Sequence, residues 1–147
     1  MTSLGLFVLR LVVGGLFAVH GYPKLFGSEG KGAALPESTK QTMGEAFVGS
    51  MDGGGIANLS GMLQSLGVPN ASKMAWVLAL GEFVGGIALI LGWKTRPVAL
   101  GLAFSQVVAI DKVHARQGLV GGYEFNATLI GATAALALTG PGKIAVD

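Results

Sequence analysis

The feature that most constrains this chain is a single carboxylate, Glu82, inside the otherwise apolar stretch Ala75–Trp93. The stretch is long enough to cross a bilayer, which takes about 20 apolar residues. A charged side chain near the bilayer centre costs about 2.5–3.5 kcal/mol, so it usually faces other helices and has a partner. Gly81 and Gly85 have the spacing of small residues that allows helices to pack closely in lipid. We therefore expect Glu82 on a packed helix face, opposite a cation.

The apolar residues gather in four segments, residues 4–22, 75–93, 97–115 and 123–139. Only 12% of the 147 residues are charged, and many of the 25 glycines lie inside apolar runs, as is common in membrane helices. Gly92 and Gly140-Pro141-Gly142 are helix stop signals after the second and fourth segments. The sequence predicts an all-α protein, an integral membrane four-helix bundle that forms a single domain over residues 1–147.

The first connection, residues 23–74, is long, polar and rich in glycine. Mixed charges and glycines over residues 28–55 predict a loop of low order. Within the connection, apolar residues recur at helical spacing over residues 56–66. This predicted amphipathic helix is too short to cross a bilayer, so we expect it at the membrane interface or over the end of the bundle.

Several polar residues are predicted to lie at one end of the bundle. In four antiparallel spans, the first and third helices end on the side where the second and fourth begin, and the long loop is on that side too. The candidates for ligand binding or proton relay at this end are His20, Lys24, Glu82, Gln106, Asp111, His114 and Glu124. Ionisable groups inside a membrane commonly mark substrate or proton paths. We therefore expect a polar cavity that opens on the long-loop side, with Glu82 towards its floor.

Arg10 is the cation expected opposite Glu82. Their depths in the bundle differ by about 7 Å at 1.5 Å per residue, which an arginine side chain can reach. The pair can belong to a ligand site, or it can be a structural ion pair that only locks two helices together. The same alternative holds for His20 and His114, which neighbouring carboxylates at the interface can satisfy.

No motif for a self-sufficient catalytic site is evident. The chain has no cysteine, which excludes thiolate metal sites, and two histidines are a thin basis for haem, so we predict no metal site and do not favour haem. A quinone is the cofactor that the polar end suits. The net charge of +2, without a basic patch, argues against nucleic acid. Lys94 and Arg96 are interpreted as anchors for anionic lipids.

Short motifs follow one another in a fixed order along the chain. They are Arg10-Leu11-Val12-Val13-Gly14, His20-Gly21-Tyr22-Pro23-Lys24-Leu25, Glu82-Phe83-Val84-Gly85-Gly86, Leu91-Gly92 with Thr95-Arg96, Ala109-Ile110 with His114 and Gly118, Gly122-Tyr123-Glu124, and Gly140-Pro141-Gly142-Lys143 with Asp147. In order and spacing they resemble the DoxX family of membrane proteins over nearly the whole chain. Residues 28–55 are longer than expected for that family, so nothing transfers to them.

The resemblance implies a four-helix, multi-pass protein of the cell (plasma or inner) membrane. The residues at the family's motif positions are Arg10, His20, Lys24, Glu82, His114 and Glu124, whereas Gln106 and Asp111 are added from depth and spacing. Some relatives are subunits of thiosulfate:quinone oxidoreductases or of membrane redox assemblies, and many have no assigned activity. The resemblance therefore supports the fold more strongly than the chemistry.

Two functional hypotheses follow. In the first, the chain is an oxidoreductase subunit of a membrane redox assembly and binds a quinone or a similar lipophilic small molecule in the polar cavity. A redox partner protein would then deliver the electrons. In the alternative, the chain is a non-catalytic membrane accessory or assembly factor that binds a partner protein or lipid. A transporter is less favoured, because four helices form a narrow bundle unless a homo-oligomer assembles.

Overall fold

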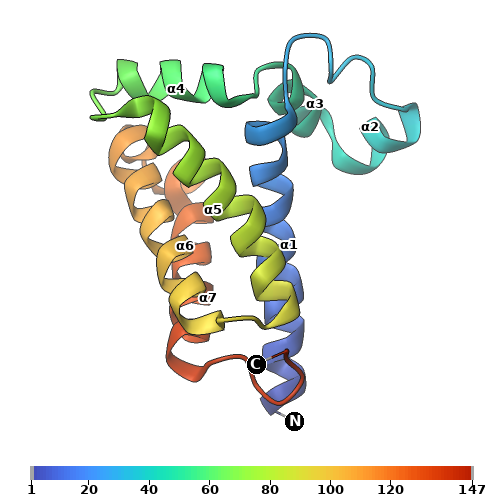
Figure 1. Ribbon diagram of the computed structural model, residues 1–147, viewed down its shortest axis with the longest axis vertical. Coiled ribbons are helices and arrows are strands. Elements are labelled where there is room, and N and C mark those ends of the chain that lie inside the picture. The colour runs from blue at the N-terminus through green and yellow to red at the C-terminus, as the bar shows by residue number, and fades with distance from the viewer. Residues whose placement is uncertain (1, 147) are drawn as a thin grey trace. The chain divides into compact units, whose positions relative to one another are not determined.

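The computed structural model describes residues 2–146, in which the regular secondary structure is helical and no strand is found (Figure 1). The α-helices in that range are α1 (Thr2–Phe26), α2 (Glu37–Met43), α3 (Glu45–Asp52), α4 (Ile56–Ser65), α5 (Ala71–Leu91), α6 (Thr95–Ala109) and α7 (Glu124–Thr139). Shorter helical turns at Ile110–His114, Ala115–Gln117 and Leu119–Tyr123 connect α6 to α7. Asp147, the end of the last expected motif, lies outside the described residues.

The chain divides into two compact units. Unit 1 consists of Met1–Ala18 and Val84–Asp147, and unit 2 consists of Val19–Phe83. Helices α1 and α5 each contribute residues to both units.

Three helices in the described part of the chain are long and apolar enough to cross a membrane. They are Thr2–Phe26, Ala71–Leu91 and the continuous helical segment Thr95–Gln117. These helices coincide with three of the four spans predicted from the sequence. The fourth predicted span corresponds to α7, which has 16 residues and is shorter than the usual transmembrane helix.

The core of unit 1 combines side chains from α1, α5, α6 and α7. Its buried members are Val13, Phe17, Leu89, Ala99, Leu102, Leu129 and Leu136. Gly14 and Gly86 let α1 and α5 approach closely, because a Cβ atom on Gly86 would lie 2.5 Å from the carbonyl oxygen of Gly14. Of the two glycines expected at a close contact, Gly85 packs against Leu102, whose side chain lies 3.4 Å from its Cβ position, whereas Gly81 has no neighbour within 4 Å.

Unit 2 has its own small core, in which Leu59 and Leu63 of α4 pack with Ala75 and Ala79 of α5. Helix α4 lies where the sequence predicted a short helix over residues 56–66. Its position at a membrane interface stays a prediction.

The low order expected for residues 28–55 is corrected, because these residues contain helices α2 and α3. Glycine here ends and begins helices: Gly44 separates α2 from α3 at a φ of 82°, and Gly55 precedes α4 at a φ of 91°. The segment is also bonded to its surroundings, since Asp52 accepts a hydrogen bond from the Gly32 amide at 2.7 Å. Composition alone favoured disorder, but these glycines supply left-handed backbone at helix boundaries.

Candidate functional site

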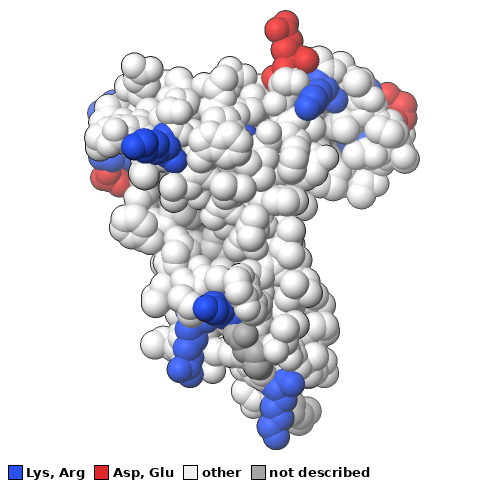
Figure 2. Space-filling view, viewed as in Figure 1, with Lys and Arg blue, Asp and Glu red and all other residues white. Residues whose placement is uncertain are grey.

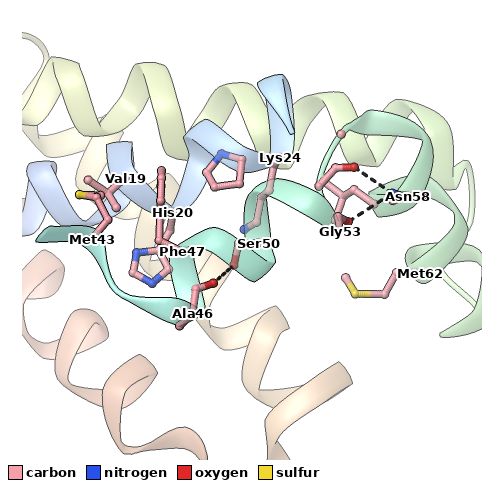
Figure 3. A pocket seen from close by; sticks show the side chains of 14 residues that line it. Val19, His20, Lys24, Met43, Ala46, Phe47, Ser50, Gly53, Asn58 and Met62 are labelled. Carbon is pink, nitrogen blue, oxygen red and sulfur yellow. Dashed lines mark hydrogen bonds between the residues drawn. The ribbon is translucent and has the colours of Figure 1, made fainter. Parts of the chain in front are cut away.

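A pocket of about 570 Å³ lies within unit 2. Its walls come from the end of α1, the last residue of α2, α3 and the start of α4. Figure 3 labels His20 and Lys24 on α1 and Phe47 and Ser50 on α3. Most of the lining side chains are apolar, such as Val19, Pro23, Met43, Leu59 and Met62. The pocket therefore suits a lipophilic molecule.

Four polar side chains line this pocket, and two of them donate hydrogen bonds to nearby backbone carbonyls. Ser50 donates to the carbonyl of Ala46 at 2.8 Å, and Asn58 donates to the carbonyl of Gly54 at 2.9 Å (Figure 3). These two side chains are thus tied to their own backbone. His20 and Lys24 add an imidazole and an ammonium group to the lining.

Lys24 forms an ion pair with Glu82, from Nζ to Oε2. The lysine side chain is 33% exposed and the glutamate side chain is 8% exposed. Gly21, one turn before Lys24, permits the contact, because a Cβ atom there would lie 2.5 Å from the backbone nitrogen of Phe83. Glu82 is therefore on a packed face opposite a cation, as its position in an apolar helix predicted.

The predicted partner of Glu82 is corrected, because the cation that binds it is Lys24 and not Arg10. Arg10 is fully buried in unit 1 and donates to the carbonyls of Leu89 and Ile90, each at 3.3 Å, and to the carbonyl of Ile144. The last carbonyls of a helix have no partner within the helix and carry its negative dipole end. The Arg10 guanidinium donates hydrogen bonds to these carbonyl groups, so its partners are backbone oxygens and not a carboxylate.

Four of the predicted site residues belong to unit 1 and have local partners there. Asn126 donates to the Gln106 side chain at 2.8 Å, Lys112 pairs with Asp111 at 2.8 Å, His114 bonds to Gln117 at 2.8 Å, and the Gly121 amide donates to Glu124 at 3.0 Å. The structure thus brings together His20, Lys24 and Glu82 in unit 2. That one polar cavity contains these three residues together with Gln106, Asp111, His114 and Glu124 stays a prediction.

Sequence reasoning missed the side chains that α2 and α3 contribute to the pocket, including Met43, Phe47 and Ser50. A usable signal was present, since Pro36 precedes Glu37 and Gly44 precedes Glu45, and an acidic residue in the first turn is typical of a helix start. Asn126, the buried partner of Gln106, was also missed. Among residues 2–146 no group of three or more metal-binding side chains is close enough to hold a metal ion.

Comparison with known proteins gives the family. The DoxX family model matches residues 5–115, about three quarters of the sequence. The chain belongs to the DoxX family. This DoxX chain is 31% identical over 145 residues to the Bacillus subtilis (strain 168) protein named "Putative oxidoreductase CatD", and the match covers 99% of this chain and 86% of CatD. No solved structure matches this DoxX chain significantly.

The family assignment confirms the resemblance that the sequence motifs indicated. The pocket residues His20 and Lys24 and the paired Glu82 all lie inside the matched range. Glu124 lies beyond it. The chain is a DoxX membrane protein with apolar helices of transmembrane length.

Proposed function

We propose that this DoxX protein is a subunit of a membrane redox assembly and binds a quinone, or a similar lipophilic molecule with a carbonyl group, in the pocket of unit 2. The observation that carries the proposal is the position of Lys24, which lines an apolar pocket while paired with the buried carboxylate of Glu82. The name of the similar protein, "Putative oxidoreductase CatD", supports the same class of chemistry.

The residues of the pocket suit such a ligand. A carbonyl oxygen needs a hydrogen-bond donor, and Lys24 and His20 carry donors on the pocket wall. Reduction of a quinone to a quinol takes two electrons and two protons, and Glu82 with Lys24 can relay protons to the ligand. The chain has no cysteine, so we assign the electron supply to a partner protein.

The proposal includes a membrane arrangement. We infer that α7 is the fourth span of a multi-pass four-helix bundle in the cell membrane, because its side chains share the core of unit 1 with side chains from the three helical segments of transmembrane length. Helix α4 would lie at the membrane interface. The pocket, which α4 helps to line, would then lie at the depth of the lipid headgroups, where a quinone ring could enter it from the membrane.

The test measures bound small molecules. The intact protein, purified in detergent, is analysed by mass spectrometry for lipophilic ligands and titrated with a soluble quinone analogue, as wild type, Lys24→Gln and Glu82→Gln. We expect a bound quinone in the wild type and affinity at least ten-fold weaker in both variants. Lys40→Gln, in the exposed pair with Glu37 on α2, is the matched control and should bind normally.

The same measurement distinguishes quinone binding from the alternative function, a non-catalytic accessory factor. A wild-type protein that carries only bulk lipid and does not bind the analogue would overturn the quinone proposal. It would favour a non-catalytic accessory factor that binds a partner through α2, because no residue of α2 is buried. Replacing residues 37–42 by glycine and serine should then abolish assembly with a defined partner and leave folding intact.

A further inference from the structure

The lining of the pocket in unit 2 leaves the charge of its ligand open. Lys24 and His20 are the ionisable residues of the lining, and no aspartate or glutamate is among the described residues of the walls. An ammonium group in an otherwise apolar pocket suits an anionic amphiphile such as a fatty acid, because a charge removed from water requires an opposite charge. A neutral ligand requires that the ammonium be compensated by the protein itself.

The protein compensates Lys24 from outside the pocket. The ammonium pairs with Glu82 of α5, and α5 contributes no residue to the described walls of the pocket. Glu82 is buried, whereas a third of the Lys24 side chain is exposed. Lys24 is therefore the contact between this buried carboxylate and the pocket, and Glu82 influences a ligand through Lys24.

The other charged side chains of unit 2 do not line the pocket. Five of them are exposed, namely Glu29, Lys31, Glu37, Glu45 and Lys73. In Figure 2 red and blue side chains project from the surface where Figure 1 draws α2 and α3. Lys40 pairs with Glu37, and Asp52 accepts a hydrogen bond from a backbone amide. Because water and salt screen exposed charges, the charge at the pocket is set mainly by Lys24 and Glu82.

Backbone packing holds the carboxylate in place beside the ammonium. A Cβ atom on Gly21, one turn before Lys24, would lie 2.5 Å from the backbone nitrogen of Phe83 and 3.0 Å from the carbonyl carbon of Glu82. The two helices are thus in direct backbone contact where the pair forms. An anion in the pocket would have to compete with a fixed carboxylate for the same ammonium.

We propose that Glu82 restricts this pocket to uncharged ligands by neutralising Lys24. The inference rests on the proposed function in using the same pocket, and it narrows the ligand class to neutral amphiphiles that carry a hydrogen-bond acceptor. An ammonium has three N–H donors, so one can bond to a ligand oxygen while the pair with Glu82 persists. An anionic ligand that took Lys24 for itself would leave the buried carboxylate uncompensated, which is costly.

The test compares two ligands with the same alkyl chain and sulfonyl group, the anion octanesulfonate and the neutral octanesulfonamide. Isothermal titration calorimetry of the intact protein, in an uncharged detergent at low salt, gives the ratio of their dissociation constants. We expect the wild type to favour the sulfonamide. Glu82→Gln keeps the size of the side chain but leaves the charge of Lys24 uncompensated. The ratio should then shift towards the sulfonate by about ten-fold or more.

Two further variants serve as controls. Glu37→Gln removes the same charge from the exposed pair on α2 and should shift the ratio by less than about two-fold. Lys24→Gln/Glu82→Gln removes both charges and should favour the sulfonamide, as the wild type does. The preference of the wild type tests the proposal even if Glu82→Gln does not fold.

Three results would overturn the proposal: a wild type that favours the sulfonate, an unchanged ratio in folded Glu82→Gln, or an equal shift in Glu37→Gln. Titration of the wild type with the quinone analogue separates this inference from the proposed function. If the analogue does not bind while the sulfonyl ligands behave as expected, the quinone proposal fails and the role of Glu82 stands. If the analogue binds while the ratio does not shift, the quinone proposal stands and the role of Glu82 fails.

Discussion

Lys24 near the end of α1 and Glu82 in the middle of α5 form an ion pair in which the glutamate is buried and the lysine reaches the pocket. The Glu82 side chain is 8% exposed, so the Lys24 ammonium compensates a carboxylate charge that is largely removed from solvent. The pair therefore links the stability of unit 2 to the pocket where we place the ligand.

Lys24→Met should destabilise the protein by about 3 kcal/mol, because it leaves a buried carboxylate without its cation. The measurement is unfolding in SDS, followed by circular dichroism. Lys24→Met/Glu82→Leu should recover most of the loss, since both charges are then absent. Lys40→Met removes an exposed pair and should cost less than about 0.5 kcal/mol. A loss in the double variant as large as in the single one would contradict this account.

Gly86→Ala should destabilise unit 1 by about 2 kcal/mol, the usual cost of forcing extra volume into a packed site. A Cβ atom there would lie 2.5 Å from the backbone nitrogen of Ala18 and from the carbonyl oxygen of Gly14, and backbone cannot move aside cheaply. Gly81→Ala, in the same helix but with open space, should be neutral or stabilising by up to about 1 kcal/mol. Thermal unfolding of both variants in one detergent compares them, and equal losses would count against the close contact.

Arg10→Lys should loosen the segment after α7 without unfolding the protein. Lysine keeps the charge but cannot reach the carbonyls of Leu89, Ile90 and Ile144 together. We expect hydrogen exchange at residues 141–146 to rise at least ten-fold, with little change in unit 2. The control is Lys112→Arg, which exchanges lysine and arginine at an exposed position. Unchanged protection of residues 141–146 would show that Arg10 does not hold this segment.

Asn126→Ala should cost about 1–3 kcal/mol, because it removes the donor to the buried oxygen of Gln106. Gln106→Leu/Asn126→Leu should be nearly neutral, since apolar groups then replace both polar partners. Thr128→Ala, whose exposed hydroxyl bonds only to its own helix at Glu124, is the control and should have little effect. Chemical or thermal unfolding measures all three, and a double variant that loses as much as Asn126→Ala would contradict the pairing.

Much of the fold could be read from the sequence, because membrane helices depend on local composition. The long apolar runs located α1, α5 and α6, and Gly92 and Gly140 marked the ends of α5 and α7. Glu82 predicted a packed face and a nearby cation, because a charged side chain in an apolar helix usually faces other helices and pairs with an opposite charge. The glycine-rich region was misread, since the same residue type serves flexible linkers and the fixed helix boundaries at Gly44 and Gly55.

The sequence by itself determined the helical class, three apolar helices of transmembrane length, the family, and the need of Glu82 for a cation. Only the tertiary structure decided which cation that is. The sequence led us to expect Arg10, whereas the close approach of Gly21 to the backbone of Phe83 brings Lys24 to Glu82. Tertiary contacts also formed the pocket, because it combines residues from α1 to α4 whose proximity no local pattern encodes.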